Sequence, residues 1–140
     1  MPVTYTIDAD KQSVRTRCIG RVTLQEVIDH FRTLEQDPRC PAHLDVFLDL
    51  SGMDVSSVPQ TAQLSRVVLE VKRVQNWVRF GACAILAPRD VVFGVMRMFE
   101  TMSNQYFRVT QSFRDGTEAE VWLASQQSSA DAGREDSRSQ

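Results

Sequence analysis

Strand-like and helix-like segments alternate along this chain of 140 residues, and the alternation restricts the folds that it can adopt. Segments rich in β-branched, aromatic and other apolar residues cover positions 3–7, 13–19, 44–50, 80–87 and 106–113. Helical patterns lie between the last four of these segments and after the fifth. Because parallel strands need a crossover connection, this order favours a mainly parallel sheet with helices packed against it. The sequence therefore predicts an α/β fold of the order β-β-α-β-α-β-α-β-α, in one domain over residues 1–125.

Short polar motifs mark the expected starts of the helices. In a capping box, a serine or threonine and a glutamate or glutamine three residues later satisfy free backbone amides at a helix start. The sequence has three such boxes, Thr23–Glu26, Ser57–Gln60 and Thr117–Glu120. Asp90 is the expected N-cap of the remaining helix. The first two strands, separated by a short polar turn, predict an antiparallel hairpin.

Residues 126–140 contain no large apolar side chain. Such a segment cannot bury enough apolar surface to offset the entropy lost when it becomes ordered. We therefore predict a disordered C-terminal tail after the single domain.

Composition argues against several classes of protein. The net charge of −2 gives no sign of the basic surface that nucleic-acid binding requires. No apolar run approaches the roughly 20 residues of a membrane helix, and the N-terminus does not resemble a signal peptide. Three widely spaced cysteines, Cys18, Cys40 and Cys83, argue against a zinc site or a disulfide framework. We expect a cytoplasmic protein that binds no nucleic acid, spans no membrane and carries no metal or cofactor.

Polar side chains follow the strand expected at residues 44–50. The carboxyl end of a strand is where α/β proteins commonly bind ligands, so we expect an interaction turn formed by Asp49, Ser51, Gly52 and Asp54. No histidine, thiol or glycine-rich phosphate loop accompanies this turn, and we predict a protein that is not an enzyme. Acid–base catalysis or cation binding by Asp49 and Asp54 is the alternative, although turn aspartates commonly bond local backbone amides. His30 and His43 have no nucleophile near them in the sequence, and we expect structural or surface roles for both.

The helix expected at residues 91–102 is apolar on more than one side. A helix of this kind is either buried or in contact with a partner. Four of its side chains are candidates for a partner or ligand face: Phe93, Met96, Met98 and Phe99. Burial of the helix fits the pattern. The alternative is a homodimer contact or the wall of an apolar pocket, where Gly94 would allow close approach.

Three blocks of sequence carry a family resemblance. They are Gly20-Arg21-Val22-Thr23 before the first helix, Asp49-Leu50-Ser51-Gly52 after the third strand, and a final block made of residues 93–100, 109–115 and 118–123. In this order and spacing the chain resembles the SpoIIAA-like proteins, small bacterial domains related to STAS domains and anti-sigma-factor antagonists. The likeness covers roughly residues 3–124.

The resemblance implies a STAS-like fold and a role in binding or signalling. In the anti-sigma antagonists a kinase phosphorylates a serine at the start of the helix after the third strand, which implies Ser56 or Ser57 in this chain. From the residues alone, Ser57 has the simpler role of a helix N-cap. The resemblance also implies a regulatory partner such as a kinase or phosphatase of the anti-sigma type. The wider group is compared with lipid-binding Sec14-type domains, which implies an apolar ligand.

Three functions are therefore open at the level of sequence. The first, which we favour, is a non-enzymatic regulatory module that binds another protein through the interaction turn and the following helix, where Arg66 and Arg73 are exposed candidates. The second is a binder of a lipid or other apolar small molecule, in a pocket beside the helix at 91–102. The third is a hydrolase or transferase that uses Asp49, Asp54 and a serine.

Overall fold

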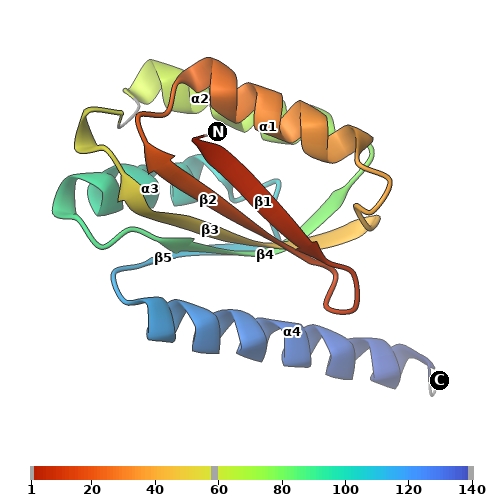
Figure 1. The fold of residues 1–140 in the computed structure, drawn as a ribbon. Helices are drawn as coiled ribbons and strands as arrows, with labels where there is room; N and C mark the ends of the chain where they lie inside the picture. Colours follow the sequence, from red (N-terminus) through yellow and green to blue (C-terminus); the bar gives the residue numbers. More distant parts are fainter. Residues whose placement is uncertain (1, 58–59, 139–140) are drawn as a thin grey trace.

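A five-stranded sheet forms the centre of the computed structural model, which describes residues 2–57 and 60–138 (Figure 1). The strands are β1 (Val3–Asp8), β2 (Ser13–Gly20), β3 (His43–Met53), β4 (Arg79–Leu86) and β5 (Val109–Phe113). They lie side by side in sequence order. β1 is antiparallel to β2, and every other neighbouring pair is parallel. The predicted hairpin and the predicted α/β class, with a mainly parallel mixed sheet, are confirmed.

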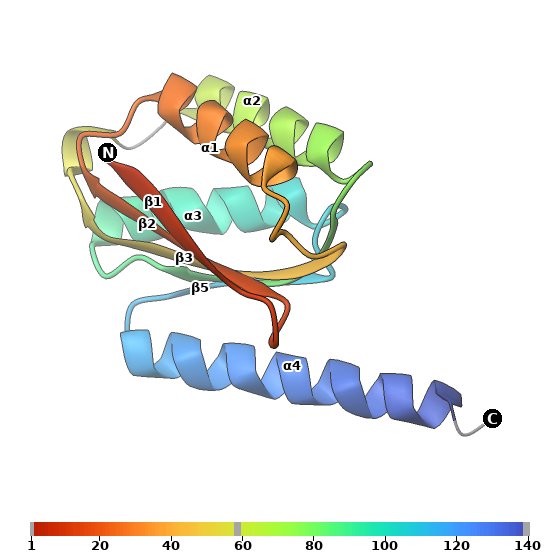
Figure 2. The same ribbon diagram turned by 45° about the vertical axis from the view of Figure 1, so that its right-hand side comes forward.

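Helices cover both faces of this sheet. Three of them pack on one face, α1 (Leu24–Gln36), α2 (Thr61–Val74) and α3 (Asp90–Ser103). The fourth, α4 (Gly116–Arg138), lies alone across the opposite face, as the two views show (Figures 1 and 2). A short 3₁₀ turn, η1 (Val55–Ser57), follows β3 in the segment that leads to α2. In the part of the chain that the structure describes, no helix is both long and apolar enough to cross a membrane.

Apolar side chains on the two sheet faces form two separate clusters. The larger cluster lies between the sheet and the helices α1–α3 and includes Leu34, Leu44, Leu64 and Ile85. The smaller cluster lies beneath α4 and consists of Phe47, Ala82, Ala84, Phe113, Ala119 and Leu123. Nearly every residue of β4 is buried, because this strand lies under helices on both of its faces.

The structure confirms one capping box and corrects two. Thr23 Oγ1 accepts a hydrogen bond from Glu26 N–H, and Glu26 Oε1 accepts one from Thr23 N–H, so α1 begins as predicted. The prediction that Ser57 caps α2 is wrong, because the chain first makes η1 and α2 begins only after Gln60. The backbone N–H of Gln60 donates to Gln63 Oε1 at 2.9 Å instead.

Residues close to the last two helix starts take roles different from those predicted. Thr117 does not cap α4, because Asp115 Oδ2 accepts the bond from Glu118 N–H at 2.9 Å and the helix begins at Gly116. Asp90 is the first residue of α3 and not its N-cap; its carboxylate binds Arg114. Both aspartates still place negative charge at a helix N-terminus, where the helix dipole favours it.

The ends of the chain's last elements also differ from the predicted bounds. β5 begins at Val109 and not at position 106, because Tyr106 N–H and Phe107 N–H both donate to Ser103 O in the turn after α3. α4 continues to Arg138, past the expected end of the domain at residue 125. Residues 139–140 lie outside the described part of the chain, and disorder of the tail in solution stays a prediction.

Candidate functional site: an apolar cavity beneath three helices

A cavity of about 370 Å³ lies between the sheet and the helices α1–α3. The floor is formed by the inward-facing side chains of β2, β3 and β4, and the walls by all three helices. Val27 and Phe31 of α1, Val67 of α2, and Met96 and Phe99 of α3 are among its lining residues. The lining is therefore mainly apolar, as is typical of small-molecule sites in proteins.

The central strand of the sheet shows the same unfilled space. Val46 and Leu48 lie in the middle of β3, on the face that α1–α3 cover, yet both side chains are only partly buried. Both also line the cavity. Close packing normally buries such positions completely, so their remaining exposure reflects space that the side chains leave unfilled.

Two polar side chains face each other inside the cavity. Thr16 on β2 is 3% exposed, and its Oγ1 lies 3.1 Å from Nε2 of His30 on α1. The His30 ring packs between Tyr5, at 5.4 Å between ring centroids, and Phe31, at 5.5 Å. Burial lowers the pKa of His30 to about 4, so the ring is neutral at physiological pH.

No charged group accompanies this pair. Among the described side chains that line the cavity there is no aspartate, glutamate, lysine or arginine. Cys18 of β2 and Cys83 of β4 also line the cavity, and both thiols are buried. Burial raises the pKa of Cys18 to about 11 and that of Cys83 further still. Both cysteines are therefore uncharged, so none of the described side chains that line the cavity carries a charge.

The cavity reaches the surface beside the 3₁₀ turn. Its exposed lining residues include Thr23, Ser56 and Gln63, which lie where the chain enters α1, η1 and α2. Ser57 is half-buried at the same end, and its Oγ accepts a hydrogen bond of 2.9 Å from Val22 N–H. This end is polar, in contrast with the apolar floor.

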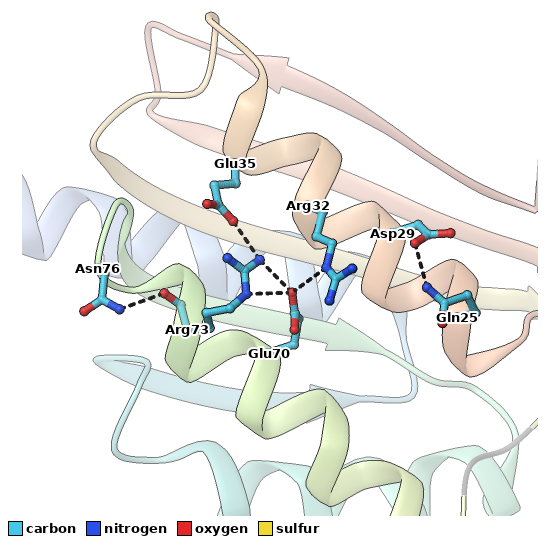
Figure 3. Close-up of polar contacts among 7 residues, drawn as sticks. All are labelled: Gln25, Asp29, Arg32, Glu35, Glu70, Arg73 and Asn76. Atoms are coloured by element: carbon cyan, nitrogen blue, oxygen red, sulfur yellow. Dashed lines mark hydrogen bonds and ion pairs between the residues drawn. The ribbon is translucent and has the colours of Figure 1, made fainter.

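An ion-pair network joins α1 to α2 on their outer side (Figure 3). Arg73 Nη2 lies 2.7 Å from both Glu35 Oε2 and Glu70 Oε1, and Arg32 Nε lies 3.4 Å from the same Glu70 oxygen. Burial would raise the pKa of Glu70, but the bonds and charges of Arg73 and Arg32 lower it below its usual value. The network holds together the two helices that form part of the cavity wall.

The residues of the predicted interaction turn lie partly in β3 and partly in the turn that follows it. β3 extends to Met53, so Asp49, Ser51 and Gly52 lie within the strand, and Gly52 pairs with Ile19 of β2. Asp49 Oδ1 accepts bonds from Ser51 N–H at 2.9 Å and Ser51 O–H at 2.6 Å. The turn itself begins at Asp54.

Asp54 repeats this local pattern. Its Oδ1 accepts bonds of 2.9 Å from both the N–H and the hydroxyl of Ser56. These two bonds lower the pKa of Asp54, with smaller contributions from the charges of Arg21 and Arg89. Asp49 and Asp54 thus each bind a serine two residues further on, as turn aspartates commonly do. Within the described residues, no group of three histidine, cysteine, aspartate or glutamate side chains could hold a metal ion.

The candidate face of α3 separates into inward and outward residues. Met96 and Phe99 line the cavity, whereas Met98 is 44% exposed and Phe93 lies under the Arg114 guanidinium, 4.5 Å from the ring centroid. At Gly94 an added Cβ would meet no atom of the described chain within 4 Å, so no element of this chain approaches closely there, and close approach of a partner stays a prediction. On α2, Arg66 is exposed, whereas Arg73 belongs to the ion-pair network.

His30 and Thr16 are the site residues whose role the sequence analysis missed. A structural or surface role is the prediction for His30, and the structure places it on the apolar stripe of α1, between Val27 and Leu34, where it lines the cavity. Thr16 similarly occupies the inward-facing position between Val14 and Cys18 on β2. The sequence did contain a signal for this pair. Two successive elements, β2 and α1, each carry one polar residue on an otherwise apolar face.

Comparison of the chain with protein-family models, with curated proteins and with solved structures gave no match. The resemblance to SpoIIAA-like proteins therefore stays a prediction.

Proposed function

We propose that this domain binds an apolar small molecule in the cavity beneath α1–α3. The observation that carries the proposal is an uncharged, mainly apolar space of about 370 Å³. Small-molecule sites typically have volumes of about 300–1,000 Å³ and contain a few well-placed polar groups. Of the functions that the sequence leaves open, this geometry favours the binder of an apolar ligand beside α3.

A titration of the isotope-labelled full chain with 1-octanol, followed by amide chemical shifts, tests this proposal. Binding should be saturable, and the shifts should concentrate on β2, β3 and the inner faces of α1–α3. Val67→Phe fills part of the cavity and should weaken binding at least about tenfold, which corresponds to about 1.4 kcal/mol.

Val91→Phe is the matched control, because Val91 is 56% exposed at the start of α3 and does not line the cavity. This variant should bind 1-octanol as the parent protein does. Absence of saturable binding to the parent protein, or equal weakening by both substitutions, would contradict the proposal.

A regulatory role is the second candidate function, and the exposed position of Ser56 favours it. The Ser56 side chain is exposed in η1, where its hydroxyl donates to Asp54 Oδ1, whereas Ser57 is half-buried and its hydroxyl accepts a bond from Val22 N–H. The charges of Arg21 and Arg89 act on this turn, as their effect on Asp54 shows, and would attract a phosphate. We propose Ser56 as the phosphorylation site of a SpoIIAA-like module whose partner is a kinase or phosphatase of the anti-sigma type.

Phosphopeptide mapping of the protein isolated from its own cells tests this second candidate. One phosphate on Ser56, lost in Ser56→Ala and retained in Ser57→Ala, is the expected result. Phosphate on Ser57 alone, or on neither serine, would contradict it.

A further inference from the structure

The cavity is selective for the chemistry of its ligand, and this inference rests on the proposed function. We propose that the ligand is an uncharged molecule with an apolar chain or ring and a single hydroxyl or carbonyl group, which hydrogen-bonds to the Thr16–His30 pair. A charged head group, such as a carboxylate or an ammonium ion, is excluded from the interior of the cavity.

The lining explains the exclusion of charge. A carboxylate that enters the cavity loses its hydration, and among the described lining side chains no lysine or arginine can replace the lost water. An ammonium ion likewise meets no aspartate or glutamate there. Transfer of an unpaired ion into an apolar environment is far more costly than transfer of a hydroxyl that finds one hydrogen-bond partner.

The Thr16–His30 pair explains the preference for one polar group. The only hydrogen bond that the described residues offer to either side chain is the contact of 3.1 Å between Thr16 Oγ1 and His30 Nε2. A neutral imidazole carries one donor and one acceptor nitrogen, and a threonine hydroxyl both donates and accepts. Either tautomer of His30 therefore leaves unused hydrogen-bonding capacity in the pair, which a hydroxyl or a carbonyl can satisfy.

The volume limits the size of the molecule. A water-sized group occupies about 30 Å³ in a liquid, so a cavity of about 370 Å³ holds roughly a dozen non-hydrogen atoms. A larger ligand would extend past Thr23, Ser56 and Gln63 into solvent. Medium-chain alcohols, ketones and comparable ring compounds fit within the cavity.

Four probes with the same eight-carbon chain test the inference at about pH 8, where octanoate is an anion and octylamine a cation. They are 1-octanol, octanoate, octylamine and 1-chlorooctane, whose affinities for the full chain are measured by amide chemical-shift titration. We expect 1-octanol to bind at least about tenfold more tightly than either ion. Thr16→Val and His30→Phe should each weaken binding of 1-octanol about three- to tenfold, while the affinity for 1-chlorooctane stays unchanged.

Thr6→Val is the matched control, because Thr6 is exposed on the adjacent strand β1, on the sheet face opposite to the cavity. It should alter no affinity, and thermal unfolding of all three variants checks that each one folds. Two results would overturn the inference and leave the proposed function intact. One is that octanoate binds as tightly as 1-octanol. The other is that Thr16→Val weakens the binding of 1-octanol and of 1-chlorooctane equally. Failure of all four probes to bind would overturn both.

Discussion

Asp45 Oδ1 accepts a hydrogen bond of 2.8 Å from the backbone N–H of Ala82. This bond lies at a bulge between β3 and β4, where Leu44 pairs with Phe80 but Val46 pairs with Cys83. One residue of β3 therefore faces two residues of β4, and the Asp45 side chain satisfies an amide that the backbone ladder leaves unpaired. A buried amide without a partner is costly, so the carboxylate stabilises the bulge.

Gly81→Ala should disrupt this arrangement. A Cβ at position 81 would lie 2.2 Å from Asp45 Oδ1, so the carboxylate would have to move and release Ala82 N–H. We expect urea denaturation to show a loss of about 1–3 kcal/mol in the free energy of unfolding. Gly52→Ala is the control within β3, because a Cβ added at Gly52 would lie 3.6 Å from its nearest neighbouring atom. This substitution should change the free energy of unfolding by less than about 0.5 kcal/mol. Equal stability of the two variants would refute this role for Asp45.

Arg73→Glu should destabilise the pairing of α1 with α2. The substitution would place a third carboxylate beside Glu35 and Glu70, whose side chains are only 15% and 10% exposed. The free energy of unfolding should fall by about 2 kcal/mol, and added salt should reduce the loss. Arg66→Glu, on the exposed side of the same helix, should change it by less than about 0.5 kcal/mol. A denaturation midpoint shared by both variants would show that the network is not stabilising.

The order of elements could be read from the sequence because it depends on local patterns. Each of these patterns is determined by residues that lie close together in the sequence. They are the alternation of strands and helices, the turn between β1 and β2, and the Thr23–Glu26 capping box. The start of α2 could not be predicted in this way, since Ser57 is drawn into a bond with Val22, 35 residues away. The extension of β3 to Met53 likewise depends on pairing with Gly20 of β2.

The site was harder to predict for a related reason. An apolar pocket beside α3 was one alternative, and Met96 and Phe99 do line the cavity. A cavity, however, is the difference between the volume enclosed and the volume filled, which no single segment determines. Thr16 and His30 meet only because β2 and α1 fold against each other, and no local sequence pattern encodes that contact.

Deletion of residues 128–140 should leave the domain's stability unchanged. Among the described side chains, those of Ala119, Trp122 and Leu123 join α4 to the smaller apolar cluster, and the sequence beyond residue 127 has no large apolar side chain. A helix without tertiary packing contributes little to stability in water. The truncated chain should unfold within about 0.5 kcal/mol of the full one, whereas Leu123→Ala should cost about 2–5 kcal/mol. A large loss on truncation would show that the tail packs on the domain.

The pH dependence of stability should reveal the lowered pKa of the partly buried His30 imidazole. Its pKa is about 4 in the folded protein and 6.5 in the unfolded chain, so acid protonates the unfolded state first. The stability that neutral His30 contributes is complete above the unfolded pKa and is lost as the pH falls towards 4. Between about pH 7.5 and pH 5 the parent protein should therefore lose about 2 kcal/mol more than His30→Phe, as measured by urea denaturation. The comparison cancels titrations that both proteins share, including that of Asp37, which holds the hydroxyl of the neighbouring Tyr5. Parallel pH profiles for the two proteins would mean that folding does not lower the pKa of His30, and the surroundings of the ring would then not disfavour charge as the proposed ligand selectivity requires.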